Sequence, residues 1–582
     1  MQKLNSILNR VPLLAWCALI FIIALGARIY WFEEKRGFHC DESMSVTLSS
    51  MNSHEISEKL KSYEIISAKD LKEIYYGNEQ TVKEVAKDIF HLRENNYDWC
   101  HTNIYYSLFR ITLWNSDTTN YENVLFRGFI LNLIIFTGTF IFLILLAREF
   151  FKNKKLPIIL ALVAGTLNMG MISMSVFLRP YELQAFTLVF FAYVFVVLAK
   201  KYWNEEKVSS WQNLILISWA IAVALLGTYF SIVEVVLLGL GLSIIAWAKT
   251  GFKEVCFLMG TFFSGIIVAS AIYPNYILGF LVGRGTEAAS KFSLTQILSN
   301  IEFSLLGEIY ILLGYFLYLP VLILLTLVVI SLIICAKKEQ KSIKKFFTNN
   351  PIEIILFVAT FLAMCAILYL APYKIVRYVA TLFPILALAI PWIIQKIHSQ
   401  NIRFLTSIFI IFVFAGTTFL VDGSKTPSNF NKEEIKTDLT FLPKIYFLGA
   451  WENPSESYFD SKLPVVVLNG NSWHIHFFDL MKLDDSLVFK FGECTDKEKE
   501  PKKNFVNDFD FPNAKIVVTY VASQIKSAPE TIILPKGKIS NFIRENNVLI
   551  WDFESAKNGG KLMLKKKIEN GLLSYDVIET VE

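Results

Sequence analysis

Long apolar runs and short polar loops alternate through the first 421 residues of this 582-residue chain. Each run has about the length, roughly 20 residues, that a helix needs to cross a hydrocarbon core of about 30 Å. The runs fall at residues 11–31, 124–147, 156–176, 181–199, 212–230, 231–248, 255–273, 312–335, 352–371, 375–395 and 404–421. The pattern predicts a bundle of about eleven transmembrane helices, with residues 295–311 in the interface or re-entering the membrane.

Lysine and arginine gather in alternate loops of this pattern. The clusters are Lys3 and Arg10; Arg148, Lys152, Lys154 and Lys155; Lys200, Lys201 and Lys207; Lys249 and Lys253; Lys337, Lys338, Lys341, Lys344 and Lys345; and Lys396 with Arg403. Basic loops favour the cytoplasmic side of a membrane. Three outer segments follow: the loop 32–122, the loop near 274–300 and the region from Asp422. The first apolar run continues through Arg28 without a small-x-small cleavage site, so we expect a retained helix.

The outer segments predict secondary structure of their own. Short apolar runs at 464–468, 487–489, 515–518, 531–534 and 548–551 lie between turn residues and predict strands. We therefore expect a mainly α membrane domain at 1–421 and a soluble extracytoplasmic α/β domain at 422–582. In the loop 32–122, an apolar stripe predicts a helix that lies on the bilayer surface or packs on its own loop. The stripe consists of Val82, Val85, Ala86, Ile89 and Phe90.

Composition supports a membrane protein and argues against nucleic-acid binding. Only 18% of the residues are charged, against about 25% in a soluble domain. The net charge is +5, and the basic residues cluster in short loops between the apolar runs, a pattern that indicates orientation in a membrane. The seven cysteines include no Cys-x-x-Cys pair, which argues against a structural zinc site.

An acidic pair, Asp41-Glu42, follows His39 and Cys40 in the first outer loop. Adjacent carboxylates at a membrane surface repel each other, and they suit cation binding or proton abstraction. The alternative is the acidic start of a helix, where carboxylates cap the backbone N–H groups.

A second polar motif runs from Asp98 through His101 to Tyr106 on the same outer side. Its Asp and His suit substrate orientation or metal binding. The alternative is a helix start, capped by Thr102 or Asn103, beside aromatic residues of the membrane interface.

Cations stand at three further outer positions. Arg179 precedes Pro180-Tyr181-Glu182 in a tight turn, and Arg matches phosphate with a bidentate fork. Lys374 and Arg377, which is followed by Tyr378, depart from the positive-inside rule; Arg284 lies in a flexible turn. For Arg179 the alternative is snorkelling to the interface. An acid/base set beside several cations suits a lipid-linked phosphate substrate.

At these residues the chain resembles the GT-C glycosyltransferases, in particular the bacterial branch of aminoarabinose transferases and protein O-mannosyltransferases, which is family 39-like. The matches are Asp41-Glu42 to the family's acidic pair, Asp98 with His101 to Tyr106 to its Asp near His-Pro-Pro-Leu-Tyr-Tyr, Arg179-Pro180-Tyr181 to its Arg-x-Tyr, and Arg377-Tyr378 with Pro384 to its late Arg-Tyr. The resemblance covers residues 1–421, and Thr102-Asn103 replaces the proline pair.

The resemblance implies an inverting transferase in the bacterial cytoplasmic membrane, with its active site on the extracytoplasmic face. It implies a polyprenyl-phosphate sugar donor and a glycan, lipid or protein acceptor. Asp41 is the expected base, Glu42, Asp98 and His101 orient the acceptor, and the donor phosphate is bound by Arg179, Tyr181, Lys374, Arg377, Tyr378 and Arg284. Metal use stays open; Asp41, Glu42 and His101 are the ligands if a divalent ion binds.

Two other classes remain possible from the residues. A transporter or flippase for a lipid-linked glycan places charges at mid-membrane, for which Glu234 and Glu308 are candidates. An O-antigen ligase or polymerase also uses outer arginines, but it has its large outer loop late in the chain.

Cys40 and Cys100 immediately precede Asp41 and His101. If both motifs line one pocket, a disulfide between them is expected in an oxidising compartment. The alternatives are two unpaired cysteines, or Cys494 as a competing partner.

Overall fold

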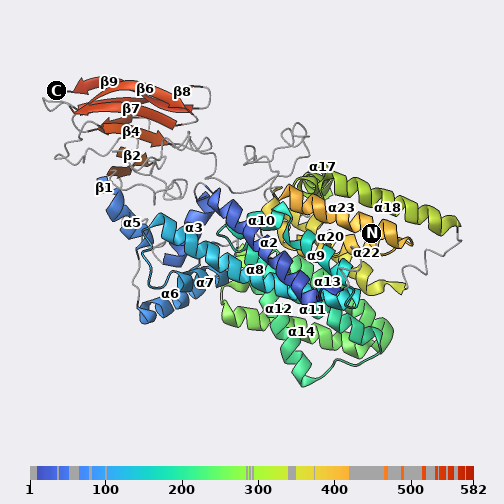
Figure 1. The fold of residues 1–582 in the computed structure, drawn as a ribbon. Coiled ribbons are helices and arrows are strands. Elements are labelled where there is room, and N and C mark those ends of the chain that lie inside the picture. The colour runs from blue at the N-terminus through green and yellow to red at the C-terminus, as the bar shows by residue number, and fades with distance from the viewer. Residues whose placement is uncertain are drawn as a thin grey trace. The chain divides into compact units, whose positions relative to one another are not determined.

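The computed structural model describes residues 10–35, 38–50, 65–77, 81–96, 98, 101–282, 286, 290–291, 294–338, 349–371 and 374–418, and beyond these the backbone of eight strands (Figure 1). The α-helices are α2 Leu13–Glu33, α3 Cys40–Ser50, α5 Ala68–Tyr76, α6 Val82–Glu94, α7 Ile104–Thr112, α8 Tyr121–Phe151, α9 Lys155–Thr166, α10 Met169–Val176, α11 Tyr181–Trp203, α12 Trp211–Gly227, α13 Ser231–Thr250, α14 Phe252–Ile272, α15 Tyr276–Val282, α17 Leu294–Ile311, α18 Tyr318–Lys338, α20 Pro351–Leu370, α21 Phe383–Leu386, α22 Ala389–Ile394 and α23 Gln400–Thr417. Short π and 3-10 turns are η1 Leu312–Phe316, η2 Val376–Tyr378 and η3 Ala380–Leu382.

The chain forms two compact units. Unit 1 comprises Met1–Lys35, Ile89–Thr112 and Gly128–Leu448, and it contains all the helices from α9 to α23. Unit 2 comprises Arg36–Asp88, Leu113–Arg127 and Gly449–Glu582. Helices α6 and α8 each run from unit 2 into unit 1.

Unit 1 is a bundle of apolar helices of membrane-spanning length. Among the described residues, seven helices are long and apolar enough to cross a membrane, or up to nine if each of two bent pairs counts as one span. Two shorter apolar helical segments, Trp211–Gly227 and Ala380–Ile394, complete the set. Every predicted apolar run coincides with one of these segments, so the chain is a polytopic helical membrane protein; the count of eleven stays a prediction.

Two of the predicted continuous spans are broken, and a third bend lies next to the predicted re-entrant segment. The run 156–176 divides into α9 and α10, which meet at 51°, because the Asn168 side chain leaves the helix and caps the N–H of Met171. The run 375–395 becomes η2, η3, α21 and α22, since Pro384 and Pro391 lack the N–H that a continuous helix needs. Helices α17 and α18 are bent by 105°, and this bend fits either a broken span or the predicted re-entrant segment.

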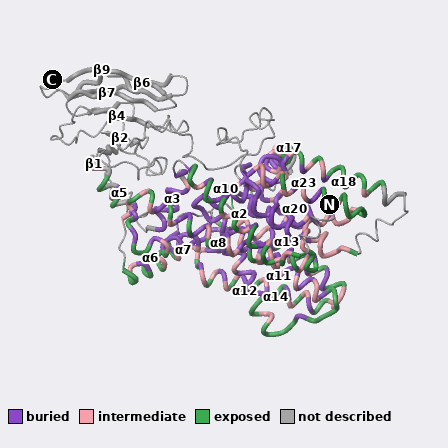
Figure 2. Tube along the Cα trace, viewed as in Figure 1, coloured by how far each residue is buried: buried purple, intermediate pink, exposed green. Residues whose placement is uncertain are grey.

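Helix α11 is the most buried of the seven helices of spanning length among the described residues: 72% of its most apolar 18-residue stretch is buried, against 28% for α2. Figure 2 colours the described residues by this burial. Close contacts on this helix need small residues. A Cβ on Gly227, at the end of α12, would lie 2.4 Å from Thr187 Oγ1 on α11. Broken helical backbone is tolerated in such an interior because protein, not lipid, surrounds it.

The strands are β1 Ile65–Ser67, β2 Val465–Leu468, β3 Leu487–Lys490, β4 Ala514–Thr519, β5 Thr531–Leu534, β6 Gly537–Glu545, β7 Val548–Ser555, β8 Lys561–Glu569 and β9 Leu572–Val581. Six of them form a mixed sheet in the order β1-β3-β2-β4-β7-β6, and β5-β8-β9 form a second sheet. Strands β2, β3, β4, β5 and β7 coincide with the five predicted runs. The α/β class and soluble nature of residues 422–582 stay predictions, because most of that region lies outside the described residues.

The predicted amphipathic helix of the first loop is present as α6. Within its stripe, Val85 is buried, whereas Val82 and Phe90 are 66% and 65% exposed. One part of the stripe therefore packs on protein, and both predicted surroundings of the helix stay open.

Candidate functional site

A buried ion pair joins two of the predicted motifs in unit 1. Arg179 Nη2 lies 2.6 Å from Asp98 Oδ2, and the two side chains are only 4% and 6% exposed. The Tyr106 hydroxyl donates a hydrogen bond to the same carboxylate oxygen. Burying a charge costs free energy of desolvation, which pairing offsets only in part. A buried ion pair is therefore a candidate for a functional role rather than a source of stability.

The turn between α10 and α11 projects Arg179 toward Asp98. Phe177 ends α10 in an extended conformation, and the Arg179 N–H donates to the Phe177 carbonyl at 2.8 Å. Asn132 of α8 fixes the turn, because its Nδ2 donates to the carbonyls of Ser175 and Phe177 at 3.0 and 2.9 Å. Helix α11 then begins directly after Pro180, whose fixed φ suits a helix start.

Asn96 holds the loop that carries Asp98 and His101. Its Oδ1 accepts a hydrogen bond from the Asp98 N–H at 3.0 Å, and its Nδ2 donates to the His101 carbonyl at 2.9 Å. The same Nδ2 lies 3.3 Å from the Tyr273 hydroxyl, just beyond the end of α14. These hydrogen bonds hold the backbone of the loop, so both carboxylate oxygens of Asp98 stay available for other partners.

Two buried tyrosines near Asp98 have raised pKa values. Burial raises the pKa of Tyr106 well above its ordinary value; Arg179 opposes this shift and Asp98 adds to it. Burial also raises the pKa of Tyr273, with hydrogen bonds to Asn96 and Tyr229 opposing the shift and Asp98 adding to it. Tyr106 therefore stays a hydrogen-bond donor to the carboxylate at neutral pH.

Aromatic rings connect this ion pair to the other motifs. His101 and Tyr181 meet edge to face at 5.3 Å between ring centroids, and Tyr181 lies 6.3 Å from Tyr378. Tyr378 in turn meets Phe230 at 5.4 Å. The structure thus brings three of the four predicted motifs, those at 98–106, 179–182 and 374–378, into one cluster.

The predicted cations of the fourth motif differ in their surroundings. Arg377 is partly exposed, and its guanidinium lies 5.2 Å from the centroid of the Tyr378 ring. Lys374 is buried, and its ammonium donates to the carbonyls of Leu368, Tyr369 and Ala371 at the end of α20. Lys374 thereby caps a helix C-terminus, where a cation is favourable, so Arg377 has the better access to an incoming anion.

A buried polar network behind the cluster escaped the sequence reasoning. Arg28 Nε donates to Ser175 Oγ at 2.8 Å, and that hydroxyl lies 2.7 Å from Glu182 Oε2. Thr139 of α8 donates to the other oxygen of Glu182 at 3.3 Å. Both charged side chains are fully buried. The available signal was an arginine inside the first apolar run, which apolar residues would otherwise fill.

The acidic pair of the first loop belongs to unit 2, at the start of α3. Glu42 is fully buried, and its Oε2 accepts a hydrogen bond from the His39 N–H at 2.6 Å, as in a capping box. The Asp41 side chain is 26% exposed, with Oδ2 at 3.7 Å from His39 Nδ1. The helix-capping alternative therefore describes Glu42, whereas Asp41 keeps a carboxylate in reach of solvent.

Several predictions fall on residues outside the described ones. These are Arg284, Cys100 and the side chain of Cys40, so the Cys40–Cys100 bridge stays a prediction. Among the residues that the structure describes, no group of three or more His, Cys, Asp or Glu side chains could hold a metal ion. Asp41 and Glu42 lie in unit 2 and His101 in unit 1. Metal binding by these three side chains stays a prediction.

Among solved structures, the chain is similar to the apo form of the Archaeoglobus fulgidus oligosaccharyltransferase, with 12% sequence identity and a TM-score of 0.38. The similarity covers 81% of this chain and 64% of that one, so this chain spans less than two thirds of that protein's length. No family model matches the sequence, and no curated protein matches it. The chain's own residues therefore carry the functional argument.

Proposed function

We propose that this protein is an integral membrane glycosyltransferase that transfers a sugar from a polyprenyl-phosphate donor to a glycan, lipid or protein acceptor. The transfer takes place at the extracytoplasmic membrane face and inverts the anomeric carbon. The observation that carries the proposal is the cluster of predicted motifs in unit 1. The buried Asp98–Arg179 pair joins two of them, the His101 and Tyr181 rings meet, and Tyr181 leads on to Tyr378 with Arg377 beside it. Cations, aromatic rings and a carboxylate at one end of a membrane bundle suit an anionic, lipid-linked sugar.

The reaction forms a bond from an acceptor oxygen or nitrogen to the anomeric carbon and breaks the bond from that carbon to the phosphate oxygen. Asp41 takes the acceptor proton, because it is the more exposed carboxylate of its pair. Polyprenyl phosphate leaves with the bonding electrons, and Arg377 stabilises the charge that develops on it. Asp98 acts as a positioning residue, since its carboxylate accepts hydrogen bonds from Arg179 and Tyr106.

The direct test is sugar transfer in proteoliposomes, with a panel of radiolabelled polyprenyl-phosphate monosaccharides and a membrane extract as the source of acceptors. Asp41→Asn should lower turnover by about 10²–10⁴, the range for losing a general base. The matched control is Glu84→Gln, which neutralises a carboxylate of α6 paired with Lys87 outside the cluster. Full turnover in Asp41→Asn, or no transfer from any donor by wild-type protein, contradicts the proposal.

One observation favours a second candidate, a flippase for a lipid-linked glycan. Two carboxyl groups are buried inside unit 1 on apolar helices: Glu234 accepts from Thr360 Oγ1 at 2.7 Å, and Glu308 accepts from the Cys365 thiol at 3.1 Å. Ionisable groups at membrane depth are typical of transport pathways. Movement of a fluorescent polyprenyl-phosphate sugar between leaflets, lost in Glu234→Gln and retained in Asp41→Asn, would establish this alternative.

A further inference from the structure

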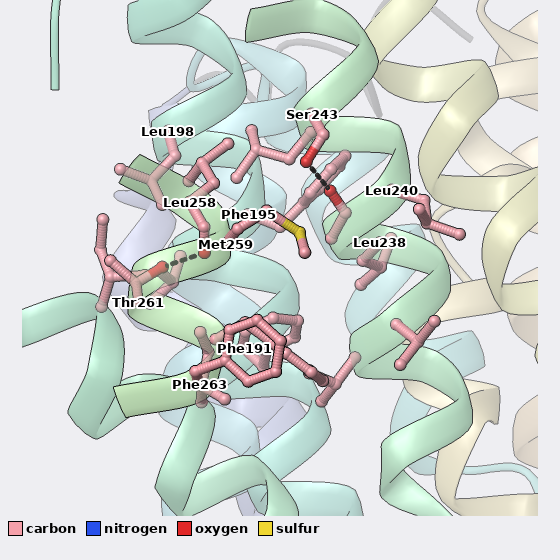
Figure 3. A pocket seen from close by; sticks show the side chains of 18 residues that line it. Phe191, Phe195, Leu198, Leu238, Leu240, Ser243, Leu258, Met259, Thr261 and Phe263 are labelled. Carbon is pink, nitrogen blue, oxygen red and sulfur yellow. Dashed lines mark hydrogen bonds between the residues drawn. The ribbon is translucent and has the colours of Figure 1, made fainter. Parts of the chain in front are cut away.

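An apolar cavity of about 250 Å³ lies among helices α11, α12, α13 and α14 (Figure 3). Its floor includes Phe195, Leu238 and Leu242, which are buried. Its rim includes Met259 and Phe263, which are 49% and 57% exposed. Because these helices are apolar and α11, α13 and α14 have spanning length, the rim faces hydrocarbon.

The polar atoms of the lining are satisfied by their own helices. Ser243 Oγ donates to the Gly239 carbonyl at 2.8 Å, and Thr261 Oγ1 donates to the Leu258 carbonyl at 2.7 Å (Figure 3). The cavity therefore offers dispersion contacts and no polar partner, which suits a hydrocarbon chain. Its size admits a segment of such a chain and excludes a headgroup.

A basic end adjoins the cavity. We define it as the Trp203 end of α11 with the ends of α12, α13 and α14 that connect to it; its exposed tryptophans and lysines are Trp203, Trp211, Trp247, Lys207 and Lys253, with partly exposed Lys201 and Lys249. Buried Glu254 of α14 holds these ends together, because it accepts hydrogen bonds from Tyr202, Val208 and Ser209. Tryptophan and lysine are the residues that bind the headgroup region of anionic lipids.

The cavity is close enough to the basic end for one phospholipid to reach both, with its phosphate at the lysines and an acyl chain in the cavity. Leu198 is two residues from Lys200 and Leu258 is five residues from Lys253, which correspond to about 3 and 8 Å along a helix. By contrast, Phe191, the cavity residue of α11 nearest to Tyr181, is ten residues from it, or about 15 Å. On α13 the lining runs from Val235 to Ser243, and Ser243 is six residues, or about 9 Å, from Lys249. The cavity therefore reaches from the leaflet that borders the basic end past the middle of the bundle.

We propose that the cavity holds one acyl chain of an anionic phospholipid whose phosphate lies among the lysines of the basic end. Lys249 is a candidate for this contact, since its ammonium lies 4.4 Å from the centroid of the Trp203 ring and is only loosely paired with Glu205, at 3.9 Å from Oε1. The bound lipid joins α11 to α14 and stabilises the bundle. The proposal does not depend on the glycosyltransferase function, because it concerns the opposite end of α11.

The test is native mass spectrometry of the full-length protein, exchanged from detergent into phosphatidylglycerol or phosphatidylcholine. Gly239→Leu places a side chain where a Cβ meets nothing within 4 Å, so it fills the cavity without a backbone clash. Retained phosphatidylglycerol should fall at least about tenfold, the effect of excluding two methylene groups. Gly260→Leu is the matched control, because its Cβ also meets nothing within 4 Å and Gly260 does not line the cavity.

Further experiments test the headgroup and the acyl chain separately, and they distinguish a phospholipid from a polyprenyl phosphate as the bound lipid. Lys249→Gln with Lys253→Gln should reduce the preference for phosphatidylglycerol over phosphatidylcholine by about fivefold per lysine. If Gly239→Leu does not fold, phosphatidylglycerol with a diazirine in its acyl chain should label α11 and α13 of the wild-type protein at the cavity. Equal lipid retention in folded Gly239→Leu and wild type, labelling elsewhere, or a polyprenyl phosphate as the retained lipid would overturn the proposal.

Discussion

The two ends of α11 hold charge in opposite ways. At the Tyr181 end, Arg179, Glu182 and Asp98 are all buried, and each is paired or hydrogen-bonded within the protein. At the Trp203 end, Lys200 pairs with Glu149 at 2.9 Å, yet the two side chains are 37% and 42% exposed. The Tyr181 end of this helix therefore adjoins buried, hydrogen-bonded charges, and its Trp203 end adjoins exposed basic side chains.

The difference separates two meanings of charge in a membrane protein. An exposed lysine near a helix end costs little and reports orientation. A buried pair loses most of its Coulomb gain to desolvation, so its position needs another reason than stability. The Tyr181 end is therefore the stronger candidate for chemistry, and the Trp203 end is the stronger candidate for contact with lipid headgroups.

The largest expected difference is in location: the Tyr181 end should lie on the extracytoplasmic side of the membrane and the Trp203 end on the cytoplasmic side. A reporter fused after Arg148 or Lys201 should give a cytoplasmic signal, and one fused after Ser461 an extracytoplasmic signal. The reason is the alternation of basic loops. Paired phosphatase and fluorescent-protein fusions at each position provide the measurement and its internal control. A cytoplasmic signal after Ser461 would contradict both the eleven-span topology and the outer location of the site.

Removal of one partner from the buried ion pair should have the next largest effect. Asp98→Ala leaves Arg179 without its carboxylate in a buried position, which costs about 3–5 kcal/mol of unfolding free energy. The measurement is the unfolding free energy of purified protein in one detergent. A double-mutant cycle with Arg179→Met gives the pair's own contribution, and a cost below about 1 kcal/mol for Asp98→Ala would show that the pair is solvated.

Much of the bundle was readable from sequence because apolar length is a strong signal. Each predicted run has a counterpart, from Leu13–Glu33 to Gln400–Thr417. The breaks were less readable: Asn168 ends one helix through a single side-chain hydrogen bond, which depends on local geometry rather than composition. Pro384 and Pro391 were visible signals for the break in 375–395, and hydropathy alone outweighed them in the prediction.

For the site, the sequence indicated which residues gather but not how they bond. Order and sidedness placed Asp98, Arg179 and Tyr378 at one end of the bundle. The sequence did not reveal that Tyr106 and Arg179 share one oxygen of Asp98, or that Lys374 caps α20. Such partners are far apart in the chain, so their pairing depends on packing that no local pattern encodes. The relation of Asp41 to this cluster stays a prediction.

Tyr106→Phe should weaken the Tyr181 end by a smaller amount, about 2 kcal/mol, for a hydrogen bond to a charged acceptor. It should also change the response to alkaline pH. Burial raises the pKa of Tyr106 in the folded protein above the unfolded value of about 10. The resulting stability is complete below pH 10 and is lost as pH rises further, because the unfolded phenol ionises first. The difference in melting temperature between wild type and Tyr106→Phe should therefore be smaller at pH 11 than at pH 8. An equal difference at the two pH values would show that the Tyr106 hydroxyl does not stabilise the fold in this way.

The smallest effect is expected from the exposed pair at the Trp203 end. Lys200→Gln or Glu149→Gln should change the unfolding free energy by less than about 1 kcal/mol, because water and salt screen two side chains that are 37% and 42% exposed. Lys200 also donates to the Glu149 carbonyl at 2.5 Å, a contact that Glu149→Gln retains and Lys200→Gln loses. Lys200→Gln should therefore be the more costly of the two, and 0.5 M salt should narrow the gap between wild type and Glu149→Gln. If Glu149→Gln instead cost as much as Asp98→Ala, the two ends of α11 would not differ in the way that their exposures indicate.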